Sequence, residues 1–251
     1  MLSRQKRADI RNLSRKKVRI ETGRFIAEGR RAVEQILANG RIRVEMILTD
    51  GESMDIGSIP VHILNKAEFS EFSETDTSQG VIAVCVTPPS ATVASVCAEP
   101  GMILALDGLQ DPGNLGTLVR TAAWFNAAGL FLGHGTTELY QPKVVRSTAG
   151  ATGMLRAAEG DLEAMLTEAA SAGRPIFILD GGEDSVPLES LRCSSQSVIV
   201  VGNEGRGVSP SILKLPYPKV RISGNASNVE SLNAAVAASI ALHHVFTQTL
   251  P

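Results

Sequence analysis

Aromatic residues, cysteines and long apolar runs are all scarce in this chain of 251 residues. Phe, Trp and Tyr together make up 4% of it, which leaves few rings for stacking on nucleic-acid bases. The three cysteines form no C-x-x-C pair, and such a scattered, odd count is typical of reduced thiols in a cytosol. No run reaches the roughly 18 apolar residues of a membrane helix. We therefore expect a cytoplasmic protein without a membrane segment.

The sequence also lacks the patterns of a metal site and of a secretory leader. Its four histidines show no ligand spacing with acids or thiols, so no metal is expected. The stretch MLSRQKRADIRNLSRKK has no apolar core and is not a secretory signal. Because this stretch is Arg-rich and amphipathic, two alternatives are left, a transit peptide and a helix that faces RNA.

The distribution of charge is uneven, although the net charge is only −2. Residues 1–43 hold 13 Lys/Arg against 4 Asp/Glu, while the remaining 208 residues hold 11 against 22. A basic arm on an acidic body favours contact with a polyanion, and nucleic acid is the natural candidate. A solvated helix face is the plainer alternative.

Apolar spacing predicts a small α/β domain followed by a larger one. Pro88, Pro89 and Pro100 stand among Ser and Thr and mark a connector, so the expected domains are residues 1–92 and 98–251. The elements expected in the first domain are one or two helices in 4–20, a helix in 24–40 closed by Asn39-Gly40, strands in 43–50, 60–65 and 80–86, and a helix in 66–76.

The second domain alternates strands and helices, which is typical of a parallel sheet built from βαβ units. The run SVIVVG (197–202) is almost continuously apolar, as a strand covered on both faces requires. Ligand loops are expected at the carboxyl ends of such strands. The expected strands are 102–107, 130–133, 175–180 and 197–202, and the expected helices begin near 111, 143, 161, 209 and 231.

The first two polar loops combine glycines with charged side chains. In DPGNLGTLVRTA (111–122), Asn114 can cap a helix, whereas Arg120 lies among apolar residues and must reach solvent or an anion. In VGNEGRGVS (201–209), the Glu204 carboxylate needs a cation or a hydrogen-bond donor, and Arg120 is the expected partner. The second loop is not a P-loop, because Lys-Ser/Thr is absent, and its glycine spacing is not a dinucleotide fingerprint.

The third polar loop is VRISGNASNVESLNAAVA (220–237), which leads into a long helix. Ser231 or Asn228 is a candidate for the N-cap of that helix. Ser231 and Asn233 can also line a pocket beside the small residues of the loop. Because all three loops follow strands, a parallel sheet brings them to one edge.

NLGTLVRTA, VGNEGRGVS and VESLNAAVA, in this order and at these distances, resemble the three signature motifs of the SpoU/TrmH family of RNA 2′-O-ribose methyltransferases, within the SPOUT superfamily. The resemblance covers about residues 100–251, and GRFIAEGRRAVEQIL resembles the opening of the family's small RNA-binding domain. It implies a deep trefoil knot, bound S-adenosylmethionine, and a homodimer whose active site is partly shared. By position, the polar catalytic set is Asn114, Arg120, Glu204, Ser231 and Asn233, and the cofactor-holding backbone belongs to Gly202, Ile222 and Leu232.

The third motif departs from the family pattern, which commonly begins with Ile-Pro-Met. RISGNASNVESLN has no Pro-Met pair and one extra residue. Counting from SLN places Ser223 at the Ile position, and counting from Gly202 places Ile222 there. We prefer Ile222, because an apolar residue should end the strand and cover the adenine.

The implied reaction is attack of a ribose 2′-hydroxyl on a sulfonium methyl group. Arginine is essentially never deprotonated in a protein, so we expect Arg120 to donate hydrogen bonds to the 2′-oxygen or an adjacent phosphate, oriented by Glu204. Ribosomal RNA is favoured over transfer RNA, because such N-terminal domains often accompany ribosomal targets. The alternatives are a non-catalytic RNA-binding or assembly factor and a dinucleotide or nucleotide-sugar enzyme, although the latter's early glycine fingerprint is missing.

Overall fold

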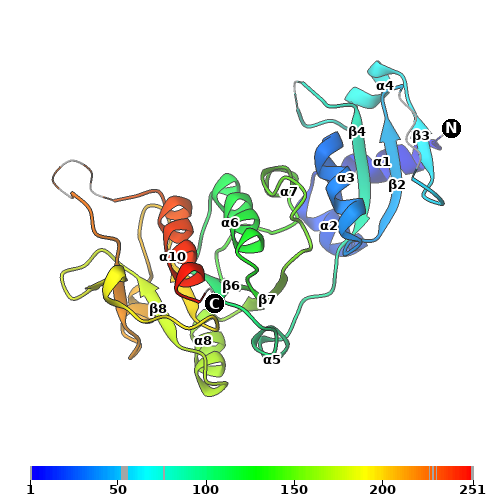
Figure 1. Ribbon diagram of the computed structural model, residues 1–251. Helices are drawn as coiled ribbons and strands as arrows, with labels where there is room; N and C mark the ends of the chain where they lie inside the picture. The colour runs from blue at the N-terminus through cyan, green and yellow to red at the C-terminus, as the bar shows by residue number, and fades with distance from the viewer. Residues whose placement is uncertain are drawn as a thin grey trace. The chain divides into compact units, whose positions relative to one another are not determined.

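The computed structural model describes residues 2–51, 56–75, 77–225, 227, 229 and 231–249. The chain forms two compact units (Figure 1). Unit 1 contains residues 1–89 and 138–154, and unit 2 contains residues 90–137 and 155–251. The segment 138–154 therefore belongs to unit 1, although it lies within the sequence of the larger unit.

Unit 1 is built on a four-stranded sheet of order β1-β4-β2-β3. β4 runs antiparallel to both β1 and β2, while β3 runs parallel to β2. Apolar clusters lie on both faces, one against α1 and α4 and the other against α3 and α7. The strands are β1 (Arg24–Glu28), β2 (Val44–Thr49), β3 (Val61–Ile63) and β4 (Val81–Val86), and the helices are α1 (Arg4–Asn12), α2 (Lys16–Thr22), α3 (Arg30–Asn39), α4 (Lys66–Ser70) and α7 (Pro142–Ser147).

The region 24–40 differs from the single predicted helix. It forms strand β1 and then helix α3, with Gly29 at a φ of 109° between them. The four residues from Phe25 to Glu28 are all buried, so this stretch is a strand covered on both faces. Helical spacing begins only at Arg30, and Gly40 closes the helix as predicted, with a φ of 63°.

Unit 2 is a seven-stranded sheet of order β7-β6-β5-β10-β8-β11-β9, and every pair in it is parallel, as predicted. Residues of α5, α8 and α9 join the apolar cluster on one face, while α10 packs on α6 and β10 (Figure 1). The strands are β5 (Ile103–Leu106), β6 (Gly129–Gly133), β7 (Arg156–Gly160), β8 (Ile176–Leu179), β9 (Val186–Pro187), β10 (Val198–Val201) and β11 (Lys219–Arg221), and the helices are α5 (Val93–Cys97), α6 (Pro112–Trp124), α8 (Leu162–Ser171), α9 (Pro210–Leu213) and α10 (Ala234–Gln248).

The sheet places the three polar loops at the edge formed by the carboxyl ends of its strands. β5 ends at Leu106, β10 at Val201 and β11 at Arg221, and the loops begin directly after them. α9 has the predicted N-terminus, with Ser209 as N-cap and Pro210 at the first helical position. In the described part of the chain, no helix is both long enough and apolar enough to cross a bilayer.

Candidate active site

The first loop enters α6 through Asp111, which is the N-cap of this helix. Asp111 Oδ1 accepts a hydrogen bond from the Asn114 backbone N–H at 2.8 Å, and Pro112 takes the first helical position, where no N–H is needed. The prediction that Asn114 caps the helix is therefore wrong. Because Asp111 performs the capping, the Asn114 side chain is available to the neighbouring loops.

The Glu204 carboxylate ties the second loop to the first. Oε1 accepts from the Asp111 backbone N–H at 2.9 Å and from Asn114 Nδ2 at 3.0 Å, and Oε2 accepts from the Gln110 backbone N–H at 3.1 Å. The predicted pairing of Glu204 with Arg120 does not form within one chain. Arg120 lies six residues after Asn114, whereas side chains on one helical face recur after three or four residues. Arg120 is exposed on another side of α6.

Glu204 is held in its ionised form by these donors. Partial burial acts to raise the pKa of the Glu204 carboxyl, but the hydrogen bonds from the Asn114 side chain and from backbone N–H groups, including those of Asp111 and Gln110, outweigh it. The pKa of Glu204 therefore lies below its ordinary value. The carboxylate is an acceptor that organises its neighbours at neutral pH.

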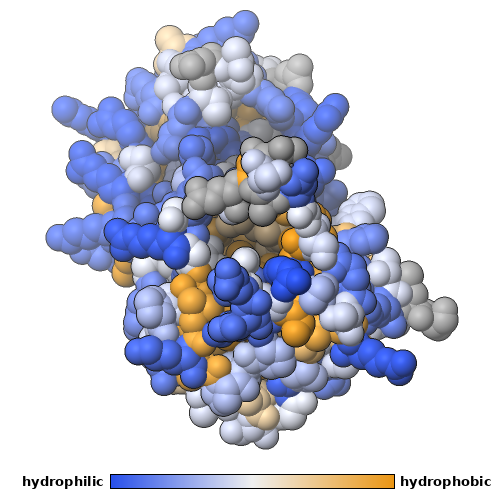
Figure 2. All heavy atoms as spheres, turned by 90° about the vertical axis from the view of Figure 1, so that its left-hand side faces the viewer, coloured by the Kyte–Doolittle hydropathy of each residue, from blue (hydrophilic) through white to orange (hydrophobic). Residues whose placement is uncertain are grey.

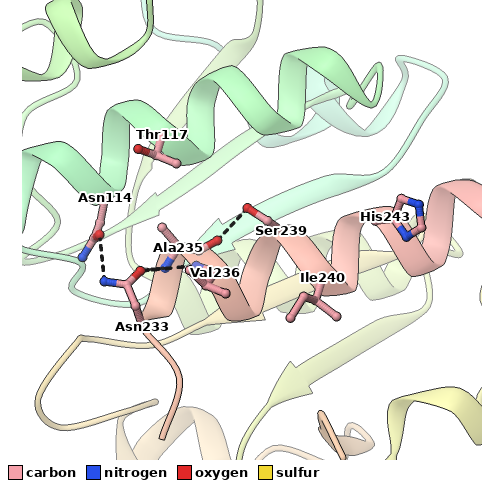
Figure 3. A pocket seen from close by; sticks show the side chains of 8 residues that line it. All are labelled: Asn114, Thr117, Asn233, Ala235, Val236, Ser239, Ile240 and His243. Carbon is pink, nitrogen blue, oxygen red and sulfur yellow. Dashed lines mark hydrogen bonds between the residues drawn. The ribbon is translucent and has the colours of Figure 1, made fainter.

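The third loop joins this arrangement through Asn233, the N-cap of α10. Asn233 Oδ1 accepts from the backbone N–H groups of Ala235 at 2.9 Å and Val236 at 3.3 Å. Its Nδ2 donates to Asn114 Oδ1 at 3.1 Å (Figure 3). The prediction that Ser231 caps α10 is thus wrong, and the other candidate, Asn228, lies outside the described residues.

Glu204, Asn114 and Asn233 form one continuous network across the three loops. Asn114 donates to Glu204 through its amide nitrogen and accepts from Asn233 through its oxygen, so both ends of the amide are used. Ser231 is exposed and makes no side-chain hydrogen bond within the described residues. Of the predicted polar set, the structure brings three members together and leaves Arg120 and Ser231 outside this network.

A groove of about 530 Å³ runs between α6 and α10 beside the network. Its polar end holds Asn114 and Asn233, and His243 lies at the other end (Figure 3). Apolar side chains of α10, Val236 and Ile240, form part of the lining between these ends. Figure 2 shows two groups of apolar residues in the lower half of the face drawn there, separated by hydrophilic side chains. In the described residues, no cluster of three His, Cys, Asp or Glu side chains suits a metal ion.

The residues predicted to hold the cofactor have the character that this role needs. A Cβ on Gly202 would lie 2.1 Å from the Gly207 carbonyl carbon, so only glycine permits this tight hairpin. Ile222 is half-buried and Leu232 is 49% exposed, and no backbone hydrogen bond involves either residue within the described chain. Apolar side chains with open backbone N–H and C=O groups fit an adenine base. Their role in holding S-adenosylmethionine stays a prediction.

Two polar residues of the site were missed by the sequence analysis. Asp111 is the helix cap described above, and Asn203 organises the second loop. Asn203 Nδ2 donates to the Gly108 carbonyl at 2.8 Å, and its Oδ1 accepts from the Gly205 and Arg206 backbone N–H groups at 3.0 and 3.2 Å. An Asn two residues before a Gly is a sequence signal for such a turn, and it could have been used.

Comparison with known proteins connects both units to RNA methylation. The model of the "SpoU rRNA Methylase family" matches residues 101–243, and the model of the "MRM3-like substrate binding domain" matches residues 6–83. The chain is 33% identical over 252 residues to the 23S rRNA (guanosine(2553)-2'-O)-methyltransferase RlmP of Bacillus subtilis (strain 168), covering 96% of each protein. It is 27% identical to the uncharacterized tRNA/rRNA methyltransferase slr1673 of Synechocystis sp., covering 95% of this chain and 89% of that protein.

A solved structure supports the same assignment. The AdoMet-bound rRNA methyltransferase from Sinorhizobium meliloti superimposes with a TM-score of 0.88 at 27% identity, covering 100% of this chain and 97% of that one. Both units are therefore represented in a single relative of known structure, and that relative binds the methyl donor.

Proposed function

The chain belongs to the SpoU rRNA methylase family, and we propose that it transfers a methyl group from S-adenosylmethionine to a ribose 2′-hydroxyl of ribosomal RNA, using the network of Glu204, Asn114 and Asn233. The resemblance found in the sequence is thus confirmed. The observation that carries the proposal is the convergence of these three side chains from three separate loops at one edge of the sheet.

The reaction places few demands on the protein. When bound, S-adenosylmethionine supplies a methyl group that the positive sulfur has already activated. The 2′-oxygen forms a bond to the methyl carbon, the carbon–sulfur bond breaks, and the hydroxyl proton passes to solvent. The chain therefore has to align the two partners and stabilise the charge that develops on the oxygen.

The network suits the positioning task. Glu204 holds the start of α6 through two backbone N–H groups, and Asn114 and Asn233 are fixed by bonds at both ends of their amides. Such side chains cost little reorganisation when a substrate arrives. Gly202, Ile222 and Leu232 would hold the cofactor next to them, and Ser231 would line the substrate side of the same loop.

Arg120 joins the site by a different route in this proposal. We place it in the active site of a second copy of the chain, because in its own chain it is exposed and no hydrogen bond or ion pair involves it among the described residues. Trp124, one helical turn later, is 83% exposed, and Val236 and Ile240 of α10 are 48% and 39% exposed. Exposed apolar residues on two adjacent helices support a homodimer contact.

Unit 1 would bind the RNA backbone. Arg4, Arg11, Arg15 and Lys16 are exposed cations of α1, α2 and the turn between them. Contacts between such cations and phosphates give an affinity that falls with salt. A cytoplasmic location and the trefoil knot belong to the same proposal and rest on the family assignment. The proposed division into an RNA-binding domain of residues 1–92 and a catalytic domain of residues 98–251 stays part of this proposal, although residues 138–154 belong to unit 1.

The test is transfer of labelled methyl groups to purified ribosomal and transfer RNA. We expect label in ribosomal RNA, and none when the mapped target nucleotide carries a 2′-deoxyribose. Arg120→Ala should abolish turnover while S-adenosylmethionine still binds in a calorimetric titration. Methylation of transfer RNA alone would favour the alternative of a tRNA methyltransferase. RNA binding without any methylation would favour the alternative of an assembly factor. Nearly intact activity of Arg120→Lys would show that the forked guanidinium is dispensable.

A further inference from the structure

We propose that Asn203 is a positioning residue for the methyl transfer, acting through Glu204 by holding the second loop against the first. This inference rests on the proposed function. Asn203 does not line the α6–α10 groove, and it is not a member of the predicted catalytic or cofactor-holding set.

The second loop is a tight hairpin whose geometry Asn203 sets from within. Its backbone N–H and C=O pair with the C=O and N–H of Gly207, both at 2.9 Å, and Gly207 has a φ of 68°. The Asn203 Oδ1 accepts from two N–H groups at the tip of the turn, those of Gly205 and Arg206. The shape of residues 203–207 therefore depends on the acceptor half of one amide.

The donor half of the same amide ties this hairpin to the first loop. Asn203 Nδ2 donates to the Gly108 carbonyl at 2.8 Å, just before the backbone N–H groups that bind Glu204. A second tie, from the Ser209 N–H to Asp107 Oδ2 at 2.6 Å, holds the far end of the loop. Glu204 thus reaches its three donors from a loop that is fastened on both sides.

The bond to Gly108 sets where the carboxylate lies, because Glu204 is the next residue in the chain. Without this bond, the ties that remain between the two loops among the described residues are the hydrogen bonds of the solvent-exposed Glu204 and the distant bond from Ser209 to Asp107. Asn is the small side chain that carries an N–H donor and an oxygen acceptor on two separate atoms. Ser can serve the turn but has no N–H for Gly108, and Asp keeps the acceptor while replacing the donor by an oxygen.

The experiment combines Asn203→Ser with Glu204→Gln in a double-mutant cycle, with kcat measured at saturating cofactor and RNA. We expect Asn203→Ser to lower kcat about ten- to a hundred-fold, since a displacement of about 1 Å can cost that much. We expect the double variant to be no slower than Glu204→Gln alone, because both changes then remove the same arrangement. The proposal would be overturned if the kcat losses of the two single variants multiplied in the double variant. A kcat for Asn203→Ser equal to that of the parent chain would also overturn it.

Hydrogen exchange of the Gln110 and Asp111 amides gives a second measurement that needs no activity. These amides donate to Glu204, so we expect them to exchange faster in Asn203→Ser, and unchanged exchange would overturn the proposal. If the parent chain methylates no RNA, the proposed function fails while this measurement still decides whether Asn203 holds the loop.

Ser197→Ala is the matched control, because it removes two loop hydrogen bonds at the opposite end of β10, one donated to the Ser194 carbonyl and one accepted from the Ser194 N–H. It should lower the unfolding midpoint without slowing turnover. If Asn203→Ser does not fold, Asn203→Asp takes its place. The results that would support or overturn the proposal are then the same as for Asn203→Ser.

Discussion

At the scale of single residues, Glu204 shows how one carboxylate can hold two loops together. Its oxygens meet three donors, two of them backbone N–H groups at the start of α6, so its position and that of the helix depend on each other. Hydrogen bonds of this kind favour the ionised form, and they oppose the effect of burial on its pKa. This carboxylate should therefore contribute to stability as well as to turnover.

The contribution of Glu204 to stability should depend on pH in one direction. Because its folded-state pKa lies below the ordinary value of 4.5, the stabilisation is complete above that pH and is lost as the pH falls through the folded-state value. Glu204→Gln should then lower the thermal unfolding midpoint at pH 7, and the difference from the parent chain should shrink below about pH 4.5. A difference that is constant from pH 7 to pH 3 would contradict this assignment.

Asn233 offers a second residue-scale test, because its two functions use different atoms. Asn233→Asp keeps an oxygen for the α10 N-cap but loses the amide that donates to Asn114. We expect little change in unfolding midpoint, since Asp caps as well as Asn, and a large loss of methyl transfer. Asn233→Ala should add a loss of about 1 kcal/mol in the free energy of unfolding. Equal activity of the Asp variant and the parent chain would remove Asn233 from the proposed set.

The sequence predicted the three members of the network, but it predicted the helix caps and the partner of Glu204 wrongly. Both errors have a physical reason. Asn114, Glu204 and Asn233 could be found, because parallel strands bring the loops after them to one edge. Several neighbouring residues can each cap a helix, and the sequence does not decide among them. Asp111 caps α6 where Asn114 was predicted, and Asn233 caps α10 where Ser231 or Asn228 was predicted. The pairing of Arg120 with Glu204 failed because it ignored the helical angle between Asn114 and Arg120.

At the scale of elements, the prediction of strands in unit 2 succeeded where a strand is continuously apolar. β5, β8 and β10 follow the predicted stretches closely, since buried strands read as continuous apolar runs. β9 and β11 span two and three residues, which is too short for any period to be visible. The strand β1 was absorbed into a predicted helix, because the helical spacing of Ala32, Val33 and Ile36 was extended back across the break at Gly29.

The exposed sides of α6 and α10 allow a test of the proposed dimer by fluorescence. Trp124 is the single tryptophan of the chain and is 83% exposed, so its emission should report whether a second copy covers α6. We expect blue-shifted emission in the dimer and a red shift on dilution or in Val236→Glu. Sedimentation should show the same variant as a monomer, while Ile63→Glu, at an exposed residue of β3 in unit 1, should leave the assembly intact. Water-like emission from a parent chain that sediments as a dimer would place the contact elsewhere.

At the scale of the whole molecule, unit 1 is completed by a segment that lies far along the chain. Arg19, 5% exposed, donates through Nε and Nη2 to the two carboxylate oxygens of Glu138 at 2.8 and 2.7 Å. Arg146 lies 3.6 Å from the buried carboxylate of Glu28. The ring of Phe25, which is fully buried, lies 4.9 Å from that of Tyr140. Patterns of neighbouring residues in the sequence cannot predict such contacts, because the two residues of each pair are more than a hundred positions apart.

Residues 1–89 alone should therefore fail to form a stable unit 1. Without Glu138, the buried Arg19 would lose its carboxylate, and breaking a buried ion pair costs about 3–5 kcal/mol, a large part of the stability of a small domain. Circular dichroism and amide NMR should show a partly unfolded fragment, and adding a peptide of residues 138–154 should restore order. In the intact chain, Glu138→Gln should destabilise more than the double change Arg19→Met with Glu138→Met, because only the first leaves a charge buried without its partner. A fragment that folds unaided, or a double variant as unstable as the single one, would show that residues 138–154 are not needed for the stability of unit 1.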